Sequence, residues 1–184
     1  MLSKIKSKGE LTRFLTSNVL ENGVGIIIST EMPQDSYVVL DIDKYYHQIS
    51  LAKTPSIADI LLVAQKLSQK EMHHIYIVEM KNISKSRYFN KKNIYKKFYT
   101  AIEDFMKIRY ADIFMDESYK VERFKLYFVS DAYRLKKRGM SEYQIKSFLL
   151  ETKINAFQSI GFFQYRNFKA IIEYQLPNPM LEWY

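Results

Sequence analysis

Two acidic residues and a lysine stand at the ends of two short apolar segments near the middle of the chain. Asp59 opens the segment DILLVA (59–64), and Glu79 and Lys81 close the segment IYIVEMK (75–81). The polar connection QKLSQKEMHH joins the two segments, as expected of two buried strands in a hairpin. Because a buried charge without a partner is costly, charged residues at the ends of buried strands are candidates for chemistry.

An antiparallel hairpin would bring these three charged side chains together. A turn centred near residue 70 places Asp59 opposite Lys81 and Leu61 opposite Glu79. Directly opposed residues share a face of a sheet, and so do residues two apart along one strand. We therefore expect Asp59, Glu79 and Lys81 on one face, at one end of the hairpin.

Such a set of side chains suits metal-assisted hydrolysis of a phosphodiester bond. Asp59 and Glu79 would supply the carboxylate oxygens that Mg²⁺ prefers, with Mn²⁺ as a substitute, and the backbone carbonyl of Met80 could add a further ligand. The ammonium of Lys81 would orient the attacking water, favour its hydroxide form and offset charge that develops on the phosphate. The alternative is an ordinary salt bridge at the rim of the sheet, which would contribute little to stability.

The order of Asp59, an apolar strand and a second strand ending in Glu79-Met80-Lys81 resembles the PD-(D/E)xK nuclease superfamily, which includes many restriction endonucleases and archaeal Holliday-junction resolvases. The resemblance implies an αβββαβ core and a Mg²⁺-dependent DNA endonuclease, of restriction type or structure-specific, that leaves 5′-phosphate and 3′-hydroxyl ends. The sequence has Ala58 before the aspartate, where the family often has proline. A second acid-x-Lys triplet, at 151–153, falls in a predicted helix and has no partner aspartate on an adjoining strand.

A fourth carboxylate is expected from the same resemblance. In this family a glutamate on the first helix often joins the metal site. The opening SKGELTRFLTSNVLENG resembles the resolvase start, in which a glutamate follows a Lys-Gly pair, and Glu10 matches that place. Glu21, at the far end of the same predicted helix, is the alternative. The gap from Glu10 to Asp59 is 59 − 10 = 49 positions, which is longer than a compact resolvase needs.

A strongly basic stretch follows the proposed site. From residue 81 to residue 97 the sequence has seven Lys and Arg residues and no acid. Beyond Lys81, we expect these side chains to contact the phosphate backbone of a nucleic acid: Lys85, Arg87, Lys91, Lys92, Lys96 and Lys97. A second basic cluster, at 134–138, is a further candidate for phosphate contact. The alternative for both clusters is a solvated surface.

Other polar motifs carry weaker signals. Asp41 and Asp43 form a DxD pattern after YVVL, which in some phosphatases and primase-like polymerases holds a metal. The segment 44–46 lacks the small residue and the Thr of those phosphatases, so we interpret the two acids as strand-end residues or supplementary acids near the nuclease site. The three histidines show no metal-ligand spacing. His73 and His74 fall in the predicted connection, where we expect them to be exposed.

The remaining elements would position the candidate site. Apolar spacing predicts helices over 9–20 and 91–110, the second with an apolar stripe of Ile94, Phe98, Ala101, Ile102 and Phe105. Ser141 with Gln144 is a capping box that opens a third helix, which we expect to end before Gly161. Further strands are predicted over 24–29, 37–43, 123–130 and 162–174. The order indicates an α/β fold with a mixed central sheet flanked by helices.

Length and composition limit these interpretations. The chain has 184 residues, with 28 Lys and Arg against 20 Asp and Glu, which gives +8 and favours an anionic partner. Its 47% hydrophobic content predicts one packed domain over 1–184, and the absence of cysteine excludes disulfides and thiol chemistry. Without an apolar run long enough for a membrane span or signal peptide, we expect a cytoplasmic protein that does not enter a membrane.

The partners follow from the proposed reaction. DNA is the expected substrate, and cutting both strands of a duplex would require a homodimer or a partner subunit. The competing interpretation is a non-catalytic nucleic-acid-binding subunit with the same fold and basic surface.

Overall fold

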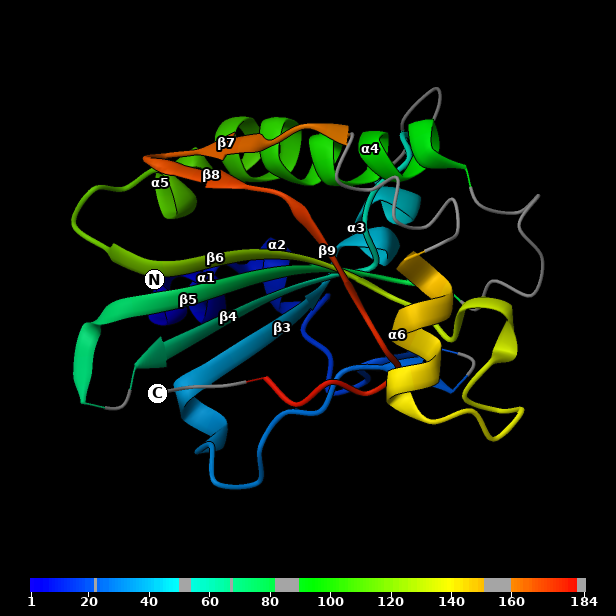
Figure 1. Cartoon of the computed structure of the whole chain (residues 1–184). Coiled ribbons are helices and arrows are strands. Elements are labelled where there is room, and N and C mark those ends of the chain that lie inside the picture. The colour runs from blue at the N-terminus through cyan, green and yellow to red at the C-terminus, as the bar shows by residue number, and fades with distance from the viewer. Residues whose placement is uncertain (22, 50–53, 67, 82–89, 151–159, 182–184) are drawn as a thin grey trace.

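A five-stranded mixed sheet forms the centre of the computed structural model, which describes residues 1–21, 23–49, 54–66, 68–81, 90–150 and 160–181 (Figure 1). Its strands lie in the order β3-β4-β5-β6-β9. They span β3 Tyr37–Asp41, β4 Ile60–Lys66, β5 Gln69–Met80, β6 Lys120–Val129 and β9 Ile172–Gln175. The first three strands are antiparallel neighbours, whereas β6 runs parallel to both β5 and β9. The predicted mixed α/β sheet is thus confirmed.

Helices and two small hairpins surround this sheet. The helices are α1 Leu2–Ser7, α2 Gly9–Thr12, α3 Ile42–Gln48, α4 Lys91–Thr100, the π-helix η3 Ala101–Arg109, α5 Ala111–Phe114 and α6 Glu142–Leu150. The hairpins are β1 Leu20–Glu21 with β2 Val24–Gly25, and β7 Phe163–Tyr165 with β8 Phe168–Ala170. Short 3₁₀ turns lie at Gln34–Ser36 and Ala132–Arg134. No helix among the described residues is both long and apolar enough to cross a membrane.

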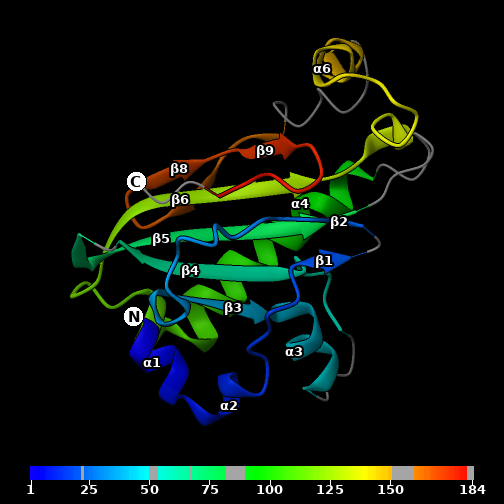
Figure 2. The ribbon, with the colours of Figure 1, turned by 90° about the horizontal axis from the view of Figure 1, so that it is seen from below.

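Both faces of the central strands are covered, which explains their nearly continuous apolar sequences. Leu61 and Ile77 belong to the core that packs against α4 and η3. Leu62 and Val78 point to the other face, where they meet Val24 of the β1–β2 hairpin. Figure 2 shows α4 behind the sheet and this hairpin in front of it. Each strand therefore sorts its odd and even residues into two separate cores.

The predicted helix over 91–110 is confirmed as one continuous helical run, α4 followed by η3. The side chain of Asn90 caps it by accepting a hydrogen bond from the Asn93 amide at 3.0 Å. All five residues of the predicted apolar stripe are buried. The second half has π-helical geometry, so the run ends against Tyr110, whose amide bonds to the Phe105 carbonyl at 3.0 Å.

The predicted capping box at the start of α6 is also confirmed. The Ser141 amide donates to Gln144 Oε1 at 2.9 Å, and the Gln144 amide donates to Ser141 Oγ at 3.3 Å. Residues 151–159, which include the second acid-x-Lys triplet, lie outside the described residues.

The predicted helix over 9–20 is wrong beyond Thr12. Residues 14–16 instead run along the edge of β3, where the Asp41 amide bonds to Phe14 and the Thr16 amide bonds to Val39. This satisfies backbone groups that an open sheet edge would leave unpaired. Glu21 pairs with Val24 in the β1–β2 hairpin, and Gly23 in the connection has φ +78°, which glycine adopts without strain.

Two further predicted strands end early. The strand over 24–29 is regular only at Val24–Gly25. The strand over 37–43 ends at Asp41, because the Asp41 side chain accepts the Lys44 amide and caps α3. The single strand predicted over 162–174 is three strands, since Arg166 adopts φ +50° and turns the β7–β8 hairpin.

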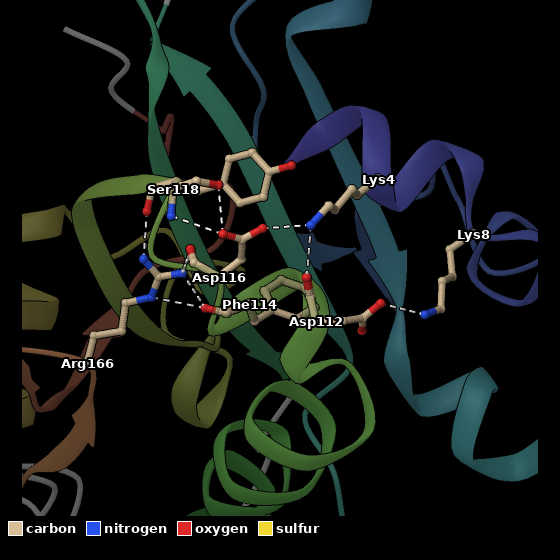
Figure 3. Close-up of polar contacts among 8 residues, drawn as sticks. Lys4, Lys8, Asp112, Phe114, Asp116, Ser118 and Arg166 are labelled. Carbon is tan, nitrogen blue, oxygen red and sulfur yellow. Dashed lines mark hydrogen bonds and ion pairs between the residues drawn. The ribbon is translucent and has the colours of Figure 1, made fainter.

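Arg166 ties this hairpin to the segment that leads into β6 (Figure 3). Its guanidinium donates to the carbonyls of Phe114, Asp116 and Tyr119 at 2.5–3.0 Å. Lys4 of α1 completes the cluster with an ion pair to Asp116 at 2.6 Å. We call this set the Arg166 cluster.

Candidate active site

Asp59 and Glu79 lie near each other at one end of the sheet, where β4 begins and β5 ends. The register pairs Ile60 with Val78 and Leu61 with Ile77, so the predicted pairing of Leu61 with Glu79 is wrong by two residues. An irregularity between Gln65 and Lys66, close to the turn, absorbs the difference. A shift of two residues leaves every side chain on its predicted face, so the two acids still share one.

One ammonium group lies between the two carboxylates. Lys97 reaches down from α4 and places Nζ 2.8 Å from Glu79 Oε2 and 3.7 Å from Asp59 Oδ1. The Glu79 side chain is 2% exposed and that of Asp59 is 16% exposed. Lys97 is held there because its neighbour Phe98 is fully buried in the core under α4. We call Asp59, Glu79 and Lys97 the carboxylate cluster.

The backbone around Asp59 joins three elements. The Met80 amide donates to the Asp59 carboxylate, which ties the end of β5 to the start of β4. The amides of Ile42 and Asp43 donate to the Asp59 carbonyl at 3.1 and 3.3 Å, which ties in the first turn of α3. Asp59 is therefore fixed by its neighbours before any ligand binds.

Burial raises the pKa of both carboxyl groups. For Asp59, the positive charge of Lys97 and the Met80 amide oppose this rise without cancelling it. For Glu79, repulsion from Asp59 raises the pKa further, against the opposing effect of Lys97. Burial would lower the pKa of Lys97, but attraction to both acids outweighs it and the pKa is raised. Burial thus disfavours the ionised form of both acids, so the pair favours binding a proton or another cation.

This donor set fits a hard divalent cation. Two close carboxylates can supply two oxygen ligands to Mg²⁺, which readily keeps water or phosphate oxygens in its other positions. Within the described residues, no group of three or more His, Cys, Asp or Glu side chains is arranged to hold a metal. Any metal here would therefore depend on Asp59, Glu79 and ligands from outside the side chains, such as a backbone carbonyl, water or phosphate.

Lys81 and Met80 continue the end of β5. The Lys81 amide donates to the Val129 carbonyl at 2.9 Å, which extends the ladder with β6. Its positive charge favours the ionised form of Glu79 and so opposes the rise in that pKa. In the part of the chain that the structure describes, its ammonium forms no ion pair with either acid of the cluster. The Met80 side chain packs on the opposite face of the sheet, so only its backbone borders the site.

The structure does not bring Glu10 to these residues. Glu10 is exposed on α2, and its Oε1 accepts the Tyr45 hydroxyl at 3.5 Å. Negative charges of Glu21 and Asp43 instead raise the pKa of Asp59. Glu21, the alternative acid, comes near through the β1–β2 hairpin and not through a helix.

The two aspartates of the DxD pattern have different places in the structure. Asp41 caps α3 through the Lys44 amide at 2.8 Å. Asp43 lies on the first turn of α3, beside Asp59, and pairs loosely with His47 at 3.6 Å. The sequence signal for this supplementary acid was its position just after a buried strand.

The expected exposure of His73 and His74 is wrong. Both are buried in β5, which begins at Gln69, six residues earlier than predicted. His74 Nε2 contacts Glu122 at 2.8 Å, and His73 Nδ1 contacts the Glu71 carbonyl at 3.0 Å.

The predicted basic residues separate by position. Lys92 and Lys96 are exposed on α4, Lys91 is half-buried, and Lys97 belongs to the carboxylate cluster. Lys85 and Arg87 lie outside the described residues. The exposed cluster at 134–138 follows β6, at the same end of the sheet as Lys81, and contains Arg134, Lys136, Lys137 and Arg138.

The chain was compared with protein-family models, curated proteins and solved structures. No family model, no curated protein and no solved structure matched the chain. The functional interpretation therefore depends on the geometry of the carboxylate cluster and on the sequence pattern around it.

Proposed function

We propose that this chain is a Mg²⁺-dependent DNA endonuclease that uses Asp59, Glu79 and Lys81. The observation that carries the proposal is the carboxylate cluster, in which two largely buried acids on adjoining strands share Lys97. A fold that keeps two carboxyl groups close, with their pKa values raised, favours cation binding and marks a candidate functional site.

An ordinary rim salt bridge is a poorer explanation. The ion pair of Lys125 with Glu173 in the same sheet has that character, because both side chains are about one-third exposed, at 38% and 31%, and are matched one to one. Glu79 is instead buried and shares its lysine with a second acid. Burying two acids with one lysine costs desolvation free energy, which a bound cation would offset.

The order of elements supports the resemblance to PD-(D/E)xK nucleases. Apart from α3 and the β1–β2 hairpin, the chain passes through an N-terminal helix pair, three antiparallel strands, the α4–η3 helix and the parallel strand β6. Asp59 precedes the second of these strands, and Glu79 and Lys81 stand at the end of the third. This order is compatible with the αβββαβ core that the resemblance implies, and it supports the proposed roles of Asp59, Glu79 and Lys81.

Each residue has a role in the proposed reaction. Asp59 and Glu79 would hold Mg²⁺, which when bound stabilises negative charge on the scissile phosphate. Lys81 Nζ would donate a hydrogen bond to the attacking water and favour its loss of a proton. Lys97 favours the ionised form of Glu79 and orients its Oε2. Cutting both strands would need a second copy or a partner subunit.

A non-catalytic DNA-binding subunit is the second candidate, and one observation favours it. Lys97 already lies between the carboxylates, so the cluster has a cation of its own. The two proposals differ in metal dependence: EDTA would abolish cleavage, whereas it would leave salt-sensitive DNA binding by a pure binding subunit unchanged.

Cleavage of supercoiled plasmid with Mg²⁺ tests the proposal. We expect Glu79→Gln, Asp59→Asn and Lys81→Met each to lower the cleavage rate about 100-fold or more, a size typical of removing a group that acts on the transition state. Glu173→Gln is the matched control, because it neutralises a paired glutamate elsewhere in the same sheet. Branched DNA substrates extend the assay if plasmid stays intact. Equal activity of the site variants and the control would contradict the proposal.

A further inference from the structure

The outer face of α4 carries an exposed stripe of lysines and tyrosines. Lys92, Tyr95, Lys96 and Tyr99 are spaced three and four residues apart, so they follow one another along one side of the helix. All four are exposed, with Tyr95 at 38% and Tyr99 at 49%. The buried residues of α4, such as Phe98, point the other way into the core.

The two tyrosine rings are held in a stacked arrangement. Their centroids are 5.8 Å apart and their planes differ by 26°. Tyr95 is also supported from behind by Phe163 of β7, with the ring centroids 5.1 Å apart. Contacts within the protein therefore order both rings, and Tyr99 is the more exposed of the two.

The β7–β8 hairpin extends this surface. Figure 1 shows the hairpin alongside the α4–η3 helix, and the contact of Tyr95 with Phe163 joins the two. Phe162, just before β7, is 59% exposed, and Lys169 Nζ lies 5.1 Å from its ring centroid. A third exposed ring, with a lysine near its face, thus lies beside the hairpin.

The charge of this surface is of one sign. Neither α4 (91–100) nor the segment 161–171 contains an aspartate or glutamate. The next acid along the helix, Glu103, forms an ion pair with Lys107 at 2.7 Å. Exposed aromatic rings among lysines that form no ion pair with a described residue suit a polyanion that also has flat apolar faces.

We propose that this aromatic surface binds an unpaired DNA strand. Bases would stack on Tyr99 and Phe162, Tyr95 would support the Tyr99 ring, and phosphates would contact the lysines beside them, Lys92, Lys96 and Lys169. A single strand fits better than a duplex, whose base faces are hidden by stacking. It also fits better than a protein partner, which would need an acidic surface to match the lysines. The choice of DNA over RNA rests on the proposed function, whereas the binding itself needs neither Asp59 nor Glu79.

Fluorescence anisotropy in EDTA tests the stacking contacts without cleavage. The probes are a labelled single strand of DNA, the duplex formed from it and an RNA strand of the same sequence. We expect the wild type to bind the DNA strand more tightly than the duplex. Tyr99→Ala and Tyr95→Ala should each weaken single-strand binding about 10-fold, and Tyr99→Phe should retain it. Tyr143→Ala is the matched control, since Tyr143 is 81% exposed on α6, outside this surface.

The lysines provide a second measurement that does not disturb the rings. Lys92→Gln with Lys96→Gln should reduce the slope of log affinity against log salt by about 0.7 for each phosphate that is no longer neutralised. Lys70→Gln, at the exposed start of β5, should leave the slope unchanged. Because all of these side chains are exposed, the variants are expected to fold, and thermal melting checks this.

The outcomes separate this inference from the nuclease proposal. Loss of single-strand binding in the tyrosine variants, with Glu79→Gln binding as tightly as wild type, supports the aromatic surface whether or not the protein cleaves DNA. Equal single-strand binding by Tyr95→Ala, Tyr99→Ala and Tyr143→Ala overturns it, even if cleavage is observed. Preference for the RNA strand, or a dimer in gel filtration that Tyr99→Ala dissociates while no strand binds, overturns it as well.

Discussion

The carboxylate cluster and the Arg166 cluster use the same kinds of charged group in opposite ways. In the Arg166 cluster, Lys4 and Asp116 are matched one to one, and the guanidinium of Arg166 is occupied by backbone carbonyls (Figure 3). Hydrogen bonds from Lys4 and Ser118 hold the pKa of Asp116 well below its usual range. In the carboxylate cluster, Asp59 and Glu79 share Lys97 and burial raises their pKa values.

The direction of the pKa shift separates the two regions. A lowered carboxyl pKa means that the folded protein stabilises the charge, so that the charge supports the fold. A raised carboxyl pKa means that the folded protein destabilises the ionised carboxylate and favours its protonated form. Structures keep such unfavourable charges mostly where a function uses them, which is why we assign structure to one cluster and chemistry to the other.

The largest effect on stability is expected from Lys97→Met. Removing the ammonium leaves two largely buried acids without their cation, and we expect a loss of about 3 kcal/mol in unfolding free energy near neutral pH. Part of the loss should be recovered at acidic pH, where the acids bind protons. Urea unfolding measures this, with Lys107→Met as control, because Lys107 has an i,i+4 partner on the same helical run. Equal losses in the two variants would contradict the shared role of Lys97.

Arg166→Lys should cause the next largest loss of unfolding free energy. An ammonium cannot reproduce the planar fork that reaches three carbonyls, so we expect a loss of about 2 kcal/mol from partly buried carbonyls that lose this donor. Arg134→Lys is matched, since Arg134 also has a positive φ but is exposed. Cleavage by the folded fraction of Arg166→Lys should stay at the wild-type rate. A specific loss of cleavage would remove the distinction between the two clusters.

The pH dependence of stability distinguishes the clusters without any ligand. Burial raises the pKa of Glu79, so the stability linked to its proton is present at low pH and is lost as the pH rises through the raised value. Glu79→Gln has no such proton to lose, and its stability relative to wild type should therefore increase with pH, by about 1.4 kcal/mol for each unit of pKa shift. Unfolding curves at several pH values measure this. A relative stability that falls as pH rises would reverse the assigned shift.

Lys4→Gln should have the smallest effect. Lys4 and Asp116 form an exposed pair, which water and salt screen. We expect a slight decrease in Tm at low ionic strength that disappears in high salt. A large loss that persists in high salt would mean that this pair, too, acts as a buried cluster.

Sequence patterns predicted the parts of the site that depend on periodicity. Side chains alternate in direction along a strand, and with a turn near residue 70 this placed Asp59 and Glu79 on one face. The prediction of a shared face holds because a register shift of two residues does not change the face. The register itself was not predictable, since it depends on an irregularity at Gln65 within a polar turn. Lys97 was expected to contact the phosphate backbone of a nucleic acid, because helical spacing alone cannot distinguish an outward lysine from one that leans over a sheet edge.

The choice between Glu10 and Glu21 as a further acid near Asp59 could not be predicted, for a different reason. A helix over 9–20 satisfied the apolar spacing, but the open edge of β3 competes for the same backbone and takes residues 14–16. The Asn-Gly dipeptide in the sequence was the signal for a hairpin, and the β1–β2 hairpin brings the charge of Glu21, and not that of Glu10, to bear on the pKa of Asp59.

Direct metal binding is the measurement that tests the central claim most directly. Calorimetric titration of Mn²⁺ into the wild type and Glu173→Gln should give one binding event of similar affinity that strengthens as pH rises, because Asp59 and Glu79 must lose protons to bind. Glu79→Gln should bind at least about 10-fold more weakly. If all three proteins bind Mn²⁺ equally, or none binds it, the carboxylate cluster is not a metal site and the proposed mechanism is wrong.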